Sequence, residues 1–179
     1  MKKGEGTPVD DAQAAIWYRK AADQGNSVAE MMLGIHYEKG RGVAQDNAQA
    51  LAWYRKAADQ GYVLAQGKLG VVYQQGLGVA QDYAQAIAWY RKAIAQDDAN
   101  SQAMLGSMYG QGLGVMRDDV VGYALLNLAA SSPGPVKALA TGLRDGLAAG
   151  MASPKIDAGK MLTAQMQRMG TLQALDAHR

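Results

Sequence analysis

The chain has 179 residues, of which 49% are hydrophobic and 19% charged, a composition typical of an ordered domain rather than a disordered segment. Its formal net charge is only +2 and no basic stripe stands out, which argues against nucleic acid as the main partner. The chain has no cysteine, which excludes disulfides, thiolate catalysis and Cys-based zinc sites, and no apolar run reaches the roughly 20 residues of a membrane-spanning helix.

One sequence pattern recurs along most of the chain. The tetrapeptide Trp-Tyr-Arg-Lys begins at Trp17, Trp53 and Trp89, each time 36 residues further on. Aspartates and leucines recur with the same spacing, at Asp10, Asp46, Asp82 and Asp118 and at Leu33, Leu69 and Leu105. Such a period predicts an array of stacked structural repeats. We number them repeat 1 (partial, 1–25), repeat 2 (about 27–61), repeat 3 (63–97) and repeat 4 (99–131).

The first helix of a complete repeat is expected near residues 27–39. Ala29, Leu33 and Tyr37 lie one turn apart and form a single apolar stripe. Gly34 lies beside that stripe, where the missing side chain would let a neighbouring helix approach closely. The segment Gly40-Arg41-Gly42 should end the helix, because glycine adopts the left-handed cap conformation without strain.

The second helix is expected to begin at Asp46, whose carboxylate can accept hydrogen bonds from the first free backbone N–H groups. Gln49 stands three residues later, as in a capping box. Trp53 and Tyr54 then fall on the apolar face, and Gly61 marks the end of the helix. Two helices this short cannot bury their own apolar faces, so stability must come from stacking on the next pair.

These residues resemble the Sel1-like repeat, a relative of the tetratricopeptide repeat. The resemblance covers roughly residues 4–131 and includes the Leu33-Gly34-x-x-Tyr37 motif, the Gly-x-Gly loop and the Trp-Tyr pair. In repeat 4 the second helix departs from the pattern, with Leu125-Leu126-Asn127-Leu128 in place of Trp-Tyr-Arg-Lys. The resemblance implies an all-α, right-handed superhelix (solenoid) of helix pairs.

Both ends of the array differ from its middle. Aligned by the period, the chain starts within the last turn of a first helix, so we expect a fragment whose helix at 10–22 exposes an apolar face through which two chains can associate. Residues 132–179 are expected to form a C-terminal cap: a helix pair from 134 to about 170, with Ser153 as an N-cap, followed by a frayed tail.

Catalytic patterns are not evident. His36 stands where the other repeats have Val72 and Met108, so it is expected to be packed or half-exposed, and His178 falls in the expected tail. There is neither a Ser–His arrangement nor a phosphate-binding loop motif. We therefore expect no enzyme activity, no cofactor and no metal. In Trp-Tyr-Arg-Lys, the aromatic residues are expected in the core between repeats and the basic residues in solvent.

A binding surface should use residues that vary between repeats and face away from the stacking core. The resemblance implies that the first helices line the concave side of the superhelix. The candidate groove residues there are Val28, Met31, Ile35, Glu38, Leu64, Val71, Gln74, Asn100 and Ser107. An apolar patch with adaptable methionine suits a peptide or helix. The alternative, of equal weight, is that these side chains pack against a preceding repeat or the adjoining first helix.

The interpretation is a protein–protein interaction scaffold that binds a peptide or protein partner in its concave groove, without nucleic-acid binding or membrane insertion. Two alternatives differ in class. One is recognition of a cell-wall glycopeptide or polysaccharide, for which Tyr62 and Tyr83 are the aromatic residues not repeated elsewhere. The other is a divergent enzyme. The resemblance favours a bacterial protein and leaves open whether it is cytoplasmic or periplasmic.

Overall fold

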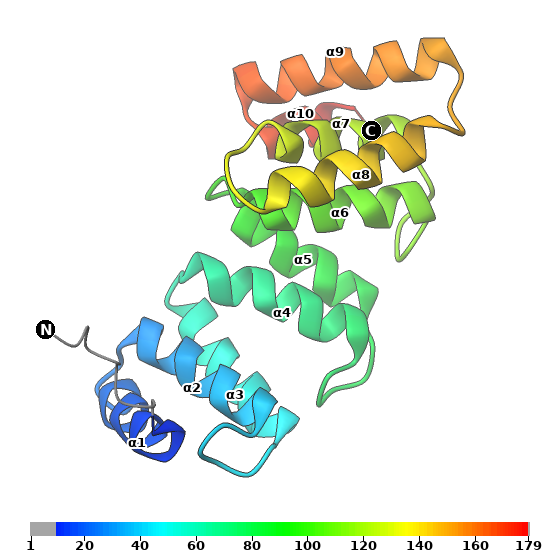
Figure 1. Ribbon diagram of the computed structural model, residues 1–179. Helices are drawn as coiled ribbons and strands as arrows, with labels where there is room; N and C mark the ends of the chain where they lie inside the picture. The colour runs from blue at the N-terminus through cyan, green and yellow to red at the C-terminus, as the bar shows by residue number, and fades with distance from the viewer. Residues whose placement is uncertain (1–9, 179) are drawn as a thin grey trace, which may run out of the picture. The chain divides into compact units, whose positions relative to one another are not determined.

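The computed structural model describes residues 10–178, which form ten α-helices and contain no strand (Figure 1). The chain divides into two compact units, residues 1–81 and 82–179. The first unit holds α1 (Asp11–Ala22), α2 (Ser27–Lys39), α3 (Asn47–Asp59) and α4 (Val63–Gln75). The second holds α5 (Tyr83–Ile94), α6 (Ala99–Gln111), α7 (Asp119–Ala130), α8 (Val136–Ala148), α9 (Ser153–Met169) and α10 (Thr171–Ala177).

The helix boundaries in repeat 2 follow the residues that predicted them. Gly40 ends α2 in the left-handed conformation, with φ of 64°. The carboxylate of Asp46 accepts hydrogen bonds from the backbone N–H groups of Ala48 and Gln49 at 2.9 and 3.0 Å. The reciprocal half of the expected capping box is replaced, because the N–H of Asp46 donates to the carbonyl of Tyr37 at 2.9 Å. This bond ties the start of α3 to the last turn of α2.

The core of the first unit lies between α2 and its neighbours. Leu33, Trp53 and Tyr54 are at most 5% exposed. A Cβ atom at Gly34 would lie 2.5 Å from the ring of Tyr54, so the glycine is what lets α3 pack against α2. The expected stacking core is therefore confirmed for repeat 2.

Each Gly-x-Gly loop rests on the start of the preceding second helix. The second glycine of the loop has a positive φ at Gly42 (66°) and Gly78 (72°). A Cβ at Gly78 would lie 2.5 Å from the backbone carbonyl of Asn47, and one at Gly42 would lie 2.1 Å from that of Asp11. In the second unit, Gly114 lies in the same way against Tyr83. That contact gives the unrepeated Tyr83 a role in packing.

The C-terminal segment contains three helices rather than a pair with a frayed tail. α9 packs on α7, and Gly159 allows the ring of Tyr123 to approach to 2.6 Å from its missing Cβ position. The N-cap of α9 is Ala152 rather than Ser153, and no side chain caps this end. The expected tail was wrong for residues 171–177, because α10 buries Ala174 and Leu175 to 1–2% exposure.

Candidate partner-binding surface

The predicted groove residues of the first unit lie on α2 and α4. Val28 and Leu64 are each 51% exposed, although both are large and apolar. Met31, Ile35 and Val71 are half-buried. In the second unit, Asn100 is exposed on α6. The apolar members are thus partly accessible, whereas the shared leucines Leu33, Leu69 and Leu105 are buried.

Glu38 has a structural environment that the sequence analysis missed. Its carboxylate accepts a hydrogen bond from the hydroxyl of Tyr54 at 2.7 Å and pairs with the ammonium of Lys68 at 2.6 Å and that of Lys39 at 3.0 Å. Burial opposes ionisation, but the bonds from Lys68, Tyr54 and Lys39 outweigh it and lower the pKa of Glu38 to about 2. Burial, and then the bond to Glu38, raises the pKa of Tyr54. Glu38 therefore joins α2, α3 and α4 rather than presenting a free charge.

Two further groove candidates make local contacts. The carbonyl of Gln74 accepts a hydrogen bond from the side chain of Gln81 at 2.8 Å. The hydroxyl of Ser107 accepts one from Gln111 at 2.6 Å. Ser107 also lines a pocket of about 270 Å³ in the second unit, with Gly106, Gly110, Gln111, Leu126, Gly142, Leu143, Gly146 and Leu147. This pocket is open and mostly apolar.

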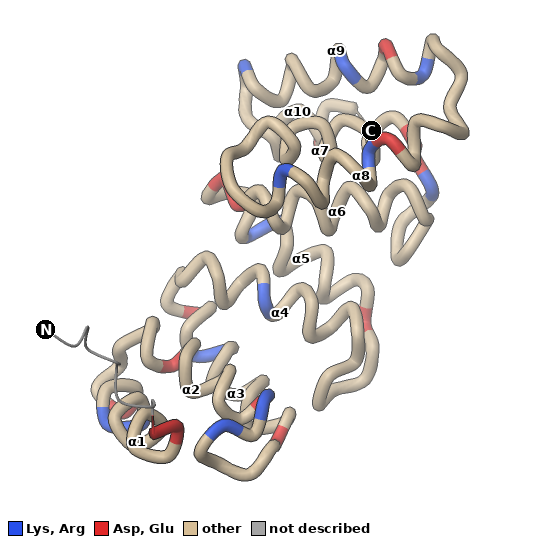
Figure 2. Tube along the Cα trace, in the orientation of Figure 1, with Lys and Arg blue, Asp and Glu red and all other residues tan. Residues whose placement is uncertain are grey.

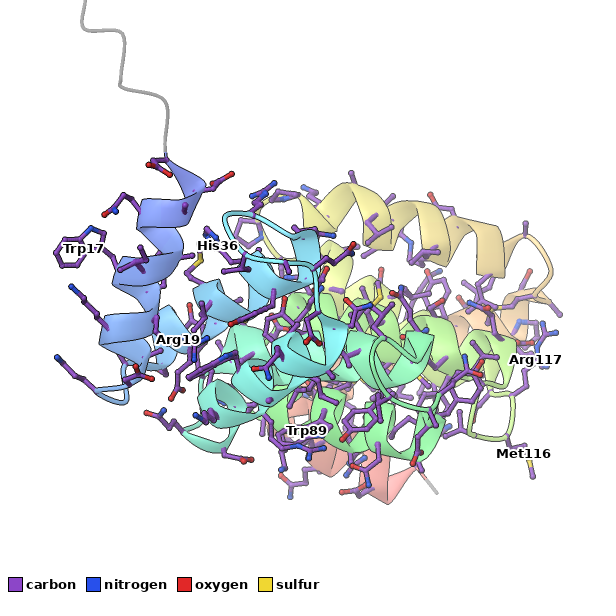
Figure 3. All side chains as sticks on the ribbon, turned by 90° about the horizontal axis from the view of Figure 1, so that it is seen from below. Trp17, Arg19, His36, Trp89, Met116 and Arg117 are labelled. Carbon is purple, nitrogen blue, oxygen red and sulfur yellow. The ribbon has the colours of Figure 1, made fainter. Side chains whose placement is uncertain are left out.

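The basic residues of Trp-Tyr-Arg-Lys were expected to point into solvent, but several of them contact aromatic rings instead. Arg19 from α1 and Lys56 from α3 lie over the ring of Trp53, at 4.9 and 3.9 Å from its centre. They cover the tryptophan at the junction of two repeats through cation–π contacts. Trp17 has no such cover apart from Lys20, stands out from α1 and is 63% exposed (Figure 3). The expected exposed apolar face on the helix at 10–22 is therefore confirmed, whereas the expected core position of the repeat tryptophan is wrong for Trp17.

The repeat arginine has two different partners in the structure. In the first unit, Arg19 donates to the hydroxyl of Tyr37, and Arg55 to that of Tyr73. In the second unit, Arg91 donates instead to both carboxylate oxygens of Asp176 on α10, at 2.8 and 2.9 Å. No local pattern predicts this exchange of partners, because Asp176 lies 85 residues away in the segment expected to be a tail.

Two pockets lie near the loops, one in each unit. That of the first unit has a volume of about 350 Å³ and is lined by Ala12, Ala15, Ile16, Arg19, Lys20, Leu33, Gly42 and Val43. Its Ile16 is 47% exposed. That of the second unit has a volume of about 300 Å³ and is lined by Tyr109, Val115, Met116, Arg117, Asp118, Val121, Leu175 and His178. Met116 and Arg117 lie at the outer edge of this unit in Figure 3.

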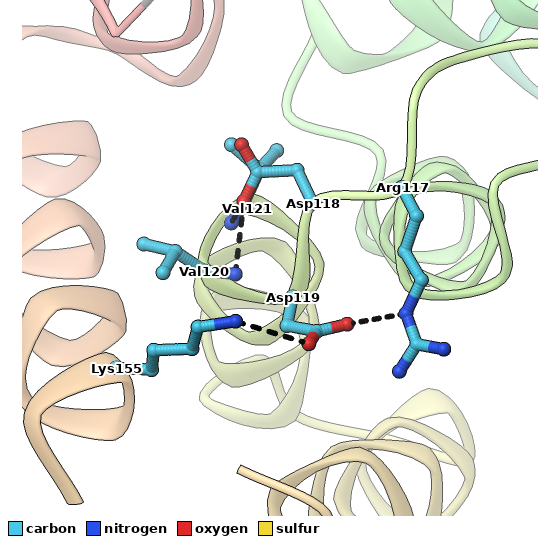
Figure 4. A network of polar contacts seen from close by, with 6 residues as sticks. All are labelled: Arg117, Asp118, Asp119, Val120, Val121 and Lys155. Atoms are coloured by element: carbon cyan, nitrogen blue, oxygen red, sulfur yellow. Dashed lines mark hydrogen bonds and ion pairs between the residues drawn. The ribbon is translucent and has the colours of Figure 1, made fainter. Parts of the chain in front are cut away.

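The titratable groups of the described residues do not converge on a reactive centre. His36 is buried, as expected, and its Nδ1 lies 2.7 Å from the carbonyl of Arg41. In the second unit, Arg117 and Lys155 both pair with the carboxylate of Asp119, and Asp118 caps α7 (Figure 4). These contacts connect structural elements at the surface.

Among the described residues, charges of both signs are interspersed along the trace of each unit (Figure 2). Among residues 10–178, no group of three or more His, Asp and Glu side chains is placed to hold a metal ion. Within the same range, the helices are all too short or too polar to cross a membrane. His178, expected in a frayed tail, instead follows α10 and lies 4.0 Å from the carboxylate of Asp118.

The helix pairs, their Gly-x-Gly loops and the covered tryptophans define an all-α repeat protein of the solenoid class, in which short pairs are stable only when stacked. The chain belongs to the Sel1 repeat family, whose model matches residues 1–26, 27–62, 63–98 and 99–133. Sel1 repeat proteins are in general scaffolds for protein–protein interaction, and the fold is typically non-catalytic.

Two solved structures from bacteria share the fold. One is c5321, a protective antigen present in uropathogenic Escherichia coli strains and described as displaying an SLR fold; it is 33% identical, with a TM-score of 0.82. The other is a Sel1 repeat protein from Oxalobacter formigenes, 30% identical, with a TM-score of 0.70. They match over 97% and 98% of this chain, which spans 36% and 52% of their lengths. No curated protein sequence matches the chain at a significant level.

Proposed function

We propose that the chain is a bacterial interaction scaffold that binds a peptide or protein segment on the first-helix surface of α2 and α4. The observation that carries the proposal is the exposure of large apolar side chains at positions that differ between repeats. Val28 and Leu64 are each 51% exposed, while Leu33 and Leu69, at the shared positions of the same helices, are 0–1% exposed. Side chains that the fold does not use are the ones available to a partner.

The chemistry of this surface favours an apolar ligand. Met31, Ile35 and Val71 are half-buried, so a partner would complete their burial at a small cost in conformational freedom. Methionine adapts to irregular apolar shapes, which suits a side chain of a peptide or helix. Glu38 supports the surface indirectly, because its bonds to Lys68 and Tyr54 hold α4 and α3 against α2.

The test compares the wild-type chain with the variant Met31→Glu/Ile35→Glu/Val71→Glu in affinity capture from native lysate. Leu139→Glu is the matched control, because Leu139 is 49% exposed on α8, outside the proposed surface. We expect a protein that the wild type and Leu139→Glu retain and the triple variant loses. Far-UV circular dichroism must show the same helix content for all three chains. Equal retention by the triple variant would place binding on another surface.

A further inference from the structure

α10 shows how a short helix is held at the outer edge of a repeat. It contacts α5 and α9 within the second unit. Asp176 pairs with Arg91 of α5, and Leu175, which is 2% exposed, lines the same pocket as Val115 of the Gly-x-Gly loop. α10 is thus held through a repeat arginine, and its Leu175 lines a pocket together with the apolar loop residue that follows the second glycine.

The first unit has the same two residues at an open pocket. Arg19 stands two periods of 36 residues before Arg91, and Val43 two periods before Val115. Both line the pocket of about 350 Å³ on α1. The apolar side chains of that pocket include Ile16, which is 47% exposed, and Leu33. Leu33 is already buried, so an equivalent of α10 would cover the exposed part of Ile16.

The hydrogen-bond partner of the pocket arginine is a neutral hydroxyl, to which a carboxylate is the stronger alternative. Arg19 donates to the hydroxyl of Tyr37, whereas Arg91 donates to a carboxylate on the outside of the array. An ionised acceptor gives a stronger hydrogen bond to a guanidinium than a neutral hydroxyl does. Lys20, exposed beside Arg19 in the same pocket, adds a second positive charge. The pocket is therefore complementary to an apolar helix that carries a negative charge.

We infer that the α1 pocket, bounded by Ile16, Arg19 and Val43, docks a short amphipathic helix of a partner protein through apolar side chains and one carboxylate, as α10 docks on Arg91. The inference deepens the proposed function, since it rests on the chain being a protein-binding scaffold. It uses a different surface from α2 and α4. The variant Met31→Glu/Ile35→Glu/Val71→Glu, which should lose binding on α2 and α4, changes no residue that lines the α1 pocket.

The test uses the whole chain and a peptide with the sequence of residues 170–178, which is known from α10 to fit the seat. The ¹⁵N-labelled chain is titrated with this peptide, and amide shifts in its NMR spectrum are mapped. We expect saturable shifts at Ile16, Arg19 and Val43. Arg19→Glu should weaken the peptide at least tenfold, and a peptide with lysine in place of Asp176 should prefer the variant over the wild type. Lys137→Glu makes the same charge change at an exposed position on α8 and should not change the affinity for either peptide.

Arg19→Glu also removes the cation–π contact of Arg19 with Trp53 and could damage the site. The lysine peptide distinguishes the two cases: a damaged site binds neither peptide, whereas an intact site with reversed charge binds the lysine peptide. Shifts confined to α5 and Val115 would mean that the peptide only exchanges with α10, and would overturn the inference. Shifts at the α1 pocket that grow with protein concentration in the absence of peptide would show that a second copy fills it with its own α10. That result would also overturn the assignment to a separate partner.

Discussion

The contact between a Gly-x-Gly loop and the preceding helix can be tested with a single methyl group at Gly78. The Cβ of Gly78→Ala would lie 2.5 Å from the backbone carbonyl of Asn47, whereas ordinary contacts begin at 3.4 Å. Because the obstacle is backbone, no side chain can rotate away. The substitution should therefore push the loop of repeat 3 off the start of α3.

The expected cost has two parts. A non-glycine residue at a φ of 72° costs roughly 1–2 kcal/mol, and overpacking against a rigid neighbour costs roughly 1–3 kcal/mol more. The free energy of unfolding should thus fall by about 2–5 kcal/mol, a large part of the 5–15 kcal/mol typical of a domain. Gly61→Ala is the matched control: its φ is 85°, but a Cβ there meets nothing within 4 Å. It should cost only the conformational part.

Urea unfolding monitored by tryptophan fluorescence and by circular dichroism at 222 nm measures both variants. The two signals must be compared, since repeat arrays can unfold in stages. We expect Gly78→Ala to lose about 1–3 kcal/mol more than Gly61→Ala. Equal losses would refute the view that the close approach of loop and helix stabilises the stack.

Three other consequences of the structure can be measured. The lowered pKa of Glu38 contributes about 2–3 kcal/mol to the free energy of unfolding, which is present above pH 4.5 and is lost as the pH falls to about 2. Glu38→Gln should therefore make the free energy of unfolding depend less on pH in this range. Urea midpoints that change with pH as they do in the wild type would contradict this. Trp53→Ala should cost about 3–5 kcal/mol in urea unfolding, whereas Trp17→Ala at 63% exposure should cost about 0.5 kcal/mol or less. Asp176→Asn should weaken α10 by about 0.5–1 kcal/mol, since the ion pair is partly exposed, and hydrogen exchange in α10 should be about two- to fivefold faster; unchanged exchange would mean that apolar contacts alone hold the helix.

The core and the helix boundaries could be predicted because the period repeats their causes. Leu33, Trp53 and Tyr54 recur at fixed spacing, and each is buried. α10 could not be predicted in this way. A seven-residue helix is too short to be stable alone, and it forms here against residues far away in the sequence, among them Arg91. No local pattern encodes such a contact.

Glu38 shows why variation between repeats is not by itself evidence of a binding site. The positions equivalent to Glu38 are Gln74 and Gly110, and those equivalent to Lys68 are Met32 and Met104. Both members of the ion pair are therefore unique to one junction, where they bond at 2.6 Å. A variable position paired with another variable position fixes one particular junction.

Some positions that differ between repeats stay exposed and do not join one repeat to the next. Val28 and Leu64 are apolar and keep half of their surface accessible, in contrast to the ion pair of Glu38 and Lys68. Their exposed surface is therefore the basis on which a partner is proposed to bind there. The same reasoning distinguishes Arg91, which pairs with a carboxylate of α10, from Arg19, whose pocket is open. In a repeat array, the residues to test first are therefore those that differ between repeats and have not been used to join one repeat to the next.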